Sequence, residues 1–298
     1  MRKGDESMYT RMSKGAKIAL YAFLIIMVII TFIPILYTIS ASFKTNFEIA
    51  SGGGLNLIPK EPTLDNFKTV WGMSGTSLNS TTTYADYTLN SIEVSLLTVV
   101  LVVLFTSMSA YCFQRGHFPG RDFLYWLFMC TMFIGAGTIT MFPILQITTK
   151  LGINNKIGLA IVQCATAGAS NLFLTIGYLK TIPKDLDDSA KIDGCSFFGT
   201  WWRIILPLSK PILATVGLMA FRSSWNNYLL PNLMLAGDQK ATTLVVAVVK
   251  LQSSGGAGAS QYNLMMAGTM LAMLPMLILF LIMNKAFVEG VTQGAVKG

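Results

Sequence analysis

Long apolar runs separated by shorter polar stretches dominate the pattern along the chain. An α-helix needs roughly 20 apolar residues to cross the hydrocarbon layer of a membrane. Runs of that length predict six transmembrane helices at about 18–40, 92–113, 123–147, 157–179, 211–235 and 264–284. We therefore expect an all-α membrane protein with one transmembrane domain at 18–285, an N-terminal segment at 1–17 and a C-terminal tail at 286–298.

The composition agrees with a lipid environment. Of the 298 residues, 53% are hydrophobic and only 12% are charged, whereas soluble domains carry roughly 25% charged residues. Residues 18–43 contain no charge. This stretch is longer than the roughly 7 to 15 apolar residues at the centre of a signal peptide, so we expect it to remain as a membrane anchor.

The distribution of basic residues predicts the orientation. Fourteen of the 22 Lys and Arg residues fall in segments on the side of the N-terminus, seven fall on the opposite side, and Arg222 lies inside a span. Because Lys and Arg are retained on the cytoplasmic side, both termini are expected in the cytoplasm. The basic residues form no stripe, which argues against a nucleic-acid partner despite the net charge of +8.

Few residues could carry catalysis or bind a metal. The four cysteines are widely spaced and the only histidine is His117, so we expect no metal site, no disulfide framework and no Ser-His-Asp or Cys-His catalytic site. The phosphate-binding pattern G-x-x-x-x-G-K-[ST] does not occur. We expect neither an enzyme nor a cofactor in this chain.

The loop at 180–210, between the fourth and fifth predicted spans, predicts two short helices joined by a turn. Gly194 suits a left-handed helix cap, Ser196 can cap the second helix, and Leu206-Pro207 is expected to end it.

Both helices of the loop are amphipathic. Apolar residues recur every four positions in the first helix, and Phe197, Trp201 and Ile205 do the same in the second. An amphipathic helix can dock into a groove of another protein or rest on lipid headgroups, and both arrangements require this periodicity. The periodicity alone leaves both interpretations open.

The same loop resembles the EAA motif of ABC-importer permeases, whose pattern is E-A-A, three residues, Gly, and then a stretch ending in I-x-L-P. Asp188, Ser189 and Ala190 stand at E-A-A, and Gly194 stands at the glycine. The final part is occupied by Ile204, Ile205, Leu206 and Pro207. Asp for Glu keeps the charge, and Ser for the first Ala keeps the small size.

In that family the segment is a coupling helix seated in a cleft of the ATPase subunit. The resemblance implies that Gly194 lets the loop turn, that Asp188 makes a polar contact, and that Phe197 and Trp201 pack in the cleft. The alternative for the two aromatic residues is packing under spans of the same chain. The full set of implied coupling residues is Asp188, Ser189, Ala190, Asp193, Gly194, Phe197, Trp201, Leu206 and Pro207.

Other segments resemble the sugar-transporting permeases of the maltose and glycerol-phosphate importer type. They are LNSIEVSLLTV, SAYCFQR with FPGR, SSWNNYLLP, and the tail FVEGVTQGAVKG, which is similar to that of the second permease in such systems. The resemblance covers nearly the whole chain. It implies a type I ABC-importer permease fold with six transmembrane helices and a cytoplasmic coupling helix.

The implied function is ATP-driven import of a sugar or oligosaccharide across a bacterial cytoplasmic membrane by alternating access. Implied partners are membrane lipid, a second homologous permease, two ATPase subunits that hold ATP and Mg, and an extracytoplasmic solute-binding protein. Importers of other solutes and a scaffolding role are weaker alternatives. The main alternative is an ion-coupled secondary carrier, but such carriers tend to show inverted repeats and several intramembrane charges, and here only Arg222 lies deep.

The translocation path has candidates in the fourth and fifth spans. A charge inside the membrane is costly and marks a cavity or an internal partner, so Arg222 either lines the path or forms a buried pair. Trp225 could stack on a sugar or anchor the chain at the interface, and the sugar contacts could also lie on the partner permease. The candidates are Gln163, Arg222, Trp225, Asn226, Asn227 and Tyr228.

Overall fold

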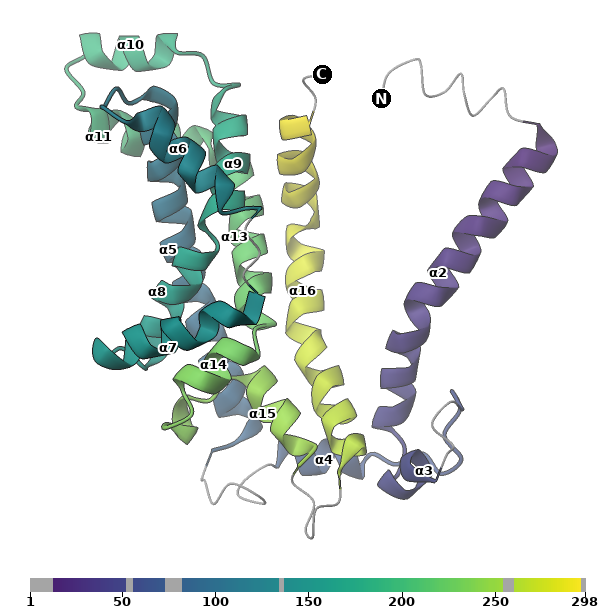
Figure 1. The fold of residues 1–298 in the computed structure, drawn as a ribbon. Coiled ribbons are helices and arrows are strands. Elements are labelled where there is room, and N and C mark those ends of the chain that lie inside the picture. Colours follow the sequence, from purple (N-terminus) through teal and green to yellow (C-terminus); the bar gives the residue numbers. More distant parts are fainter. Residues whose placement is uncertain (1–12, 52–55, 73–81, 134–136, 254–259, 296–298) are drawn as a thin grey trace. The chain divides into compact units, whose positions relative to one another are not determined.

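The computed structural model describes residues 13–51, 56–72, 82–133, 137–253 and 260–295. Within these ranges every regular element is a helix, as the sequence pattern predicts. The chain divides into two compact units (Figure 1). One combines Met1–Val70 with Leu251–Met270, and the other combines Trp71–Lys250 with Leu271–Gly298.

Helix α2 (Lys14–Ser42) contains the first predicted span. Ser13 opens it, because the Ser13 hydroxyl accepts a hydrogen bond from the backbone N–H of Ala16 at 3.2 Å. Pro34 lies inside the helix without ending it. The side chains of its apolar stretch are exposed, as expected where lipid is the solvent. Most of the predicted N-terminal segment at 1–17 lies outside the described residues.

Two short helices follow α2 in the first unit. They are α3 (Asn46–Ala50) and α4 (Asp65–Trp71). The buried Asn66 amide donates to the carbonyl groups of Ser42 and Lys44, each at 2.8 Å. These bonds attach α4 to the end of α2.

Helix α16 (Tyr262–Ala295) contains the last predicted span. It begins in the first unit, where the Asn263 amide donates to Asn66 Oδ1 at 2.7 Å. The backbone stays helical through Ala295, so the predicted tail at 286–298 continues the span as far as the structure describes it. Residues 296–298 lie outside the described part.

Helix α5 (Tyr84–Arg115) is the central helix of the second unit. It starts with a capping box at Thr83, eight residues before the predicted second span. The helices packed along it are α8 (Lys156–Thr166), α9 (Gly168–Leu179) and α13 (Lys210–Trp225). Many buried positions of α5 are Ser, Thr or Ala, and such small residues let helices approach closely in a membrane.

The fourth predicted span, 157–179, is a bent pair rather than one helix. α8 and α9 meet at an angle of 57° across Ala167. At Gly168 a Cβ would lie only 3.2 Å from the Phe128 ring. A larger side chain at position 168 would require the Phe128 ring to shift by a few tenths of an ångström.

The third predicted span, 123–147, is divided. It comprises α6 (Arg121–Cys130), a 3₁₀ turn (Gly137–Thr140) and α7 (Met141–Lys150), and residues 134–136 are outside the described part. By length and apolar character three continuous described helices can cross a membrane, namely α2, α5 and α16. Bent pairs raise this number to five, so the predicted count of six is not reached within the described residues.

The fifth predicted span, 211–235, also ends early. α13 stops at Trp225, and the Asn227 side chain accepts a hydrogen bond from Leu230 N–H at 3.3 Å as the next helix starts. The interruption falls at the polar residues Asn226 and Asn227, which the apolar residues on either side had concealed in the sequence. The chain continues through α14 (Leu229–Met234), a 3₁₀ turn (Gln239–Ala241) and α15 (Leu244–Leu251).

The predicted helical loop at 180–210 is present. It consists of α10 (Asp185–Ile192), α11 (Phe197–Thr200), a π-helical turn (Trp201–Ile205) and α12 (Leu206–Leu208). α10 and α11 lie at the end of the second unit where α5 and α9 finish (Figure 1).

Candidate functional site

The loop α10–α12 turns at Gly194, as its sequence predicts. Acidic residues occupy the first turn of α10 and Lys191 its last turn, an arrangement that complements the helix dipole. Gly194 has φ +78°, and Cys195 N–H donates to the carbonyl of Ala190 at 2.9 Å. This left-handed cap favours glycine because a Cβ strains the backbone there.

The second half of the loop differs from its prediction in one respect. Ser196 caps α11 as expected, because its hydroxyl accepts from Gly199 N–H at 3.1 Å. The helix ends at Leu208, one residue later than the predicted Leu206-Pro207, and meets α13 at 81°. A π turn precedes Pro207. Its wider hydrogen-bond spacing accommodates a residue that lacks an N–H and crowds the preceding turn.

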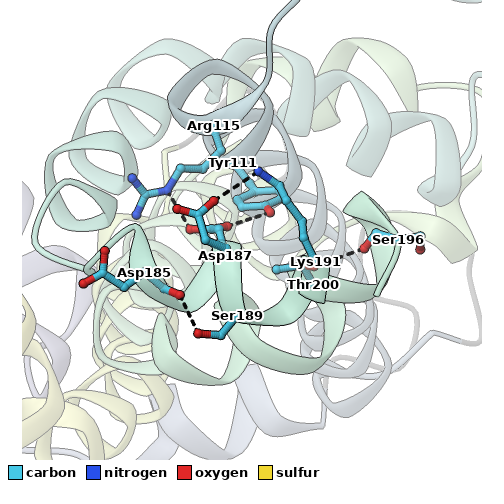
Figure 2. Close-up of polar contacts among 9 residues, drawn as sticks. Tyr111, Arg115, Asp185, Asp187, Ser189, Lys191, Ser196 and Thr200 are labelled. Carbon is cyan, nitrogen blue, oxygen red and sulfur yellow. Dashed lines mark hydrogen bonds and ion pairs between the residues drawn. The ribbon is translucent and has the colours of Figure 1, made fainter. Parts of the chain in front are cut away.

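A buried ionic network ties α10 to α5. Asp187 Oδ1 accepts a hydrogen bond from the Tyr111 hydroxyl at 2.8 Å, and Oδ2 lies 3.1 Å from Arg115 Nε (Figure 2). The side chains of Arg115 and Asp187 are each 8% exposed. A second nitrogen of Arg115, Nη2, donates to the carbonyl of Ile182 at 2.6 Å. Sequence reasoning placed Asp187 in the helix but gave it no partner.

The predicted coupling residues divide into exposed and buried groups. Asp188 points outward and pairs with Lys191 at 3.3 Å, one turn further on. Ala190 is buried and packs under the helix. The other members that lie at the surface are Ser189, Asp193, Gly194, Phe197 and Pro207, and Leu206 is half-buried.

The two aromatic residues predicted to pack in the cleft differ in exposure, because Phe197 lies at the surface and Trp201 is buried. Trp201 is 3% exposed and packs in the core with Ile205, which favours the alternative of packing within the chain. Phe198 and Trp202 are 58% and 52% exposed. In the sequence FFGTWWRII, Phe197 and Trp201 are four residues apart, and so are Phe198 and Trp202. Periodicity alone therefore could not show which pair is buried.

Two further details complete the surface of the loop. Ile192, which sequence analysis did not select, is 87% exposed at the end of α10. The Phe197 ring is 46% exposed and also lies 4.4 Å from the Tyr111 ring, measured between centroids. Phe197 therefore joins the exposed face of the loop to the buried network.

Two of the predicted path residues, Arg222 and Asn226, lie on an exposed face of α13 and its C-cap that also carries Ser223. Arg222, Ser223 and Asn226 are exposed, and with the exposed Met219 they follow the three-and-four spacing of one helix face. In the described part of the chain no acidic side chain pairs with Arg222. This polar stripe thus presents charge and amide groups outward from a span.

Other path candidates lie inside the packing of the chain. Gln163 is 6% exposed, and its Oε1 accepts from the hydroxyl groups of Thr98 at 2.9 Å and Ser224 at 2.6 Å. This joins α5, α8 and α13. Trp225 is buried and its indole N–H donates to the carbonyl of Ala272 at 3.3 Å. Asn227 and Tyr228 are half-buried.

No group of three or more His, Cys, Asp or Glu residues in the described ranges could hold a metal ion. All four cysteines are free thiols and none is paired with another.

Residues 115–293 match the family described as "Binding-protein-dependent transport system inner membrane component". The galactooligosaccharides transport system permease protein GanQ of Bacillus subtilis (strain 168) is 34% identical over 93% of this chain and 94% of its own. The arabinooligosaccharides transport system permease protein AraQ of Halalkalibacterium halodurans is 33% identical over 89% of this chain and 91% of its own.

A relative with a different cargo in its name is also similar. The sn-glycerol-3-phosphate transport system permease protein UgpE of Pectobacterium atrosepticum is 30% identical over 94% of this chain and 97% of its own. Among solved structures, a chain of a bacterial ABC transporter involved in the import of the acidic polysaccharide alginate superposes with a TM-score of 0.74 at 22% identity, over 93% of this chain and 99% of that one. The chain belongs to the family of inner membrane components of binding-protein-dependent transport systems, the permease subunits of ABC importers.

Proposed function

We propose that this chain is one of two permease subunits of an ATP-driven importer for an oligosaccharide. The observation that carries the proposal is the exposed helical loop α10–α12, which bears the EAA-like motif at one end of the helical unit. Relatives named for galactooligosaccharide and arabinooligosaccharide transport support the cargo class. ATP and Mg would bind to separate ATPase subunits, and an extracytoplasmic binding protein would deliver the sugar.

The loop provides a surface suited to an ATPase cleft. Ile192, Phe198 and Trp202 are the exposed apolar anchors, and Asp188 with Lys191 supplies charge beside them. Apolar and aromatic anchors with a polar rim are typical of energetically important interface centres. In the membrane the loop would lie on the cytoplasmic side, with both termini, and the full subunit would have six spans.

The polar stripe of α13 provides a surface suited to the translocation path. Exposing Arg222, Ser223 and Asn226 to hydrocarbon would be costly, because ionisable groups inside membranes face an aqueous cavity or a protein partner. Hydroxyl and amide groups can hydrogen-bond to sugar hydroxyls. We infer that this face lines a path between this subunit and a second, homologous permease.

The mechanism follows from the two surfaces. ATP binding closes the ATPase dimer and moves the two helical loops seated on it, one from each permease. The spans attached to those loops shift, and the cavity opens alternately to the outside and to the inside. This chain contributes positioning and hydrogen bonding only.

Affinity purification tests the proposal. The chain is tagged in its native membrane, extracted in mild detergent, and the bound proteins are identified by mass spectrometry. A second permease and an ATPase in defined stoichiometry are expected. A chain that purifies alone under several mild detergents, while the ATPase is present in the same membranes, would contradict it. Loss of the ATPase from the double variant Phe198→Ala/Trp202→Ala, with the second permease still bound, would place the ATPase contact on the loop.

A further inference from the structure

The segment SAYCFQR contributes two residues to one buried acceptor. Tyr111 and Arg115 stand one helical turn apart on α5, and both contact Asp187 of α10. These residues are 72 or more positions from Asp187 in the chain. The proposed ATPase contact requires only the exposed face of the loop and does not involve this buried contact between α5 and α10.

The network resists separation of α10 from α5. Asp187 and Arg115 are both largely buried, and withdrawing either would leave an unpaired charge in a poorly solvated place, a change that proteins disfavour strongly. Arg115 also donates to the carbonyl of Ile182, so one guanidinium holds both the start of the loop and α10. Figure 2 shows Tyr111 and Arg115 converging on the Asp187 carboxylate.

Helix α5, which carries Tyr111 and Arg115, runs through the second unit. α5 packs along α8, α9 and α13, and α13 carries the polar stripe. Gln163 adds a polar junction among α5, α8 and α13, since its Oε1 accepts from Thr98 and Ser224. A displacement applied to the inner end of α5 would therefore be transmitted to α13 by direct packing.

We propose that Tyr111, Asp187 and Arg115 form a rigid link through which displacement of α10 by the ATPase enters α5 directly. The covalent route runs instead from α10 through Gly194 and the turn at Ser209, both of which are sharp bends. The three residues are positioning residues, and the inference rests on the proposed function. It predicts that the link governs how much sugar moves per ATP, beyond its effect on stability.

The test uses the complete importer in proteoliposomes, with the permease pair, the ATPase and the sugar-loaded binding protein. Sugar uptake and ATP hydrolysis are measured together for the wild type, Asp187→Asn and Tyr111→Phe. Asp185→Asn is the matched control, because Asp185 lies on the same helix but is exposed. Asp187→Glu keeps the charge and serves as the conservative variant.

The link predicts that Asp187→Asn complexes of normal subunit stoichiometry still hydrolyse ATP but move about tenfold less sugar per ATP, a size typical of a coupling free energy between sites. Tyr111→Phe should show a smaller loss, Asp187→Glu a partial recovery, and Asp185→Asn none. If Asp187→Asn fails to assemble, the amount of sugar moved per ATP in the Tyr111→Phe and Asp187→Glu complexes tests the link instead.

An unchanged sugar-to-ATP ratio in assembled Asp187→Asn and Tyr111→Phe complexes would overturn the link and leave the proposed function intact. An equal loss in Asp185→Asn would also overturn it. A wild-type complex that shows no ATP-driven uptake would instead refute the proposed function, and the link with it.

Discussion

Two adjacent aspartates illustrate how the structure divides roles at the scale of single residues. Neighbouring positions on a helix point about 100° apart, so Asp187 faces α5 while Asp188 faces outward. The motif resemblance selected Asp188, which lies at the surface. It could not select Asp187, because its partner Arg115 comes from a distant segment and no local pattern specifies that pairing.

Gly194 was predictable from sequence, because a helix cap is a local property. Its φ of +78° makes Gly194→Val unfavourable, although a Cβ would meet no atom within 4 Å. We expect a loss of about 1–2 kcal/mol from backbone strain, with reduced coupling of ATP hydrolysis to uptake. Gly194→Asn should lose less, since Asn adopts this conformation more readily. Thermal unfolding of the purified complex measures the stability of the two variants. Equal stability of the Val and Asn variants would contradict the account.

Gln163 was selected from sequence for its hydrogen-bonding amide, but its buried position between helices was not predicted. It was expected on the path, whereas it accepts two hydroxyl hydrogen bonds inside a three-helix junction. Gln163→Leu should lower the stability of the detergent-solubilised protein by about 0.6 kcal/mol for each lost bond, the average measured for hydrogen bonds between membrane helices. Thr166→Val, on the exposed side of α8, is the control. A Leu variant as stable as wild type would remove the junction from the account.

At the scale of elements, the helices and caps of the loop α10–α12 were largely predictable from sequence. The exposure of Phe198 and Trp202 was not. Both caps, Gly194 and Ser196, follow from local sequence and are confirmed. The exposed face is set by the core, which accepts Trp201 and Ile205, and by the π turn that shifts the register before Pro207. Neither is encoded in the spacing of apolar residues.

Trp201 and Trp202 provide a matched pair for testing that face. Trp201→Ala should destabilise the permease by about 3–5 kcal/mol, because a buried aromatic side chain leaves a cavity. Trp202→Ala should leave thermal stability nearly unchanged and weaken binding of the ATPase by about 2 kcal/mol or more, as for an interface anchor. Thermal unfolding and an ATPase binding titration distinguish them. The reverse assignment of the two effects would show that the loop presents its other face.

At the scale of the whole molecule, composition and apolar run length predicted the membrane class and the helical architecture. They did not predict how runs break, because the breaks depend on contacts. One predicted span bends by 57° next to Gly168, which packs against the Phe128 ring, and the helix of another ends at Trp225, before Asn226 and Asn227. Three continuous helices in the described residues are long enough to cross a membrane, and the bent pairs are α8 with α9 and the loop helices Phe197–Leu208 with α13.

The path between subunits makes a prediction of its own at this scale. In a background without native cysteines, Arg222→Cys should react with a membrane-impermeant thiol reagent if the stripe of α13 lines the proposed aqueous path. Ala220→Cys, buried on the same helix at 2% exposure, should not react. Arg222→Leu should reduce sugar uptake while the subunits still assemble. A cysteine at position 222 that stays unreactive in every nucleotide state would show that the stripe faces protein rather than a path.

The most direct test of the central claim is uptake of labelled oligosaccharide by proteoliposomes that contain this chain, its partner permease, the ATPase and the binding protein. The account predicts uptake that requires ATP inside the vesicles, requires the binding protein, and is unaffected by ionophores. Uptake that proceeds without ATP and disappears when the ion gradient is collapsed would contradict it.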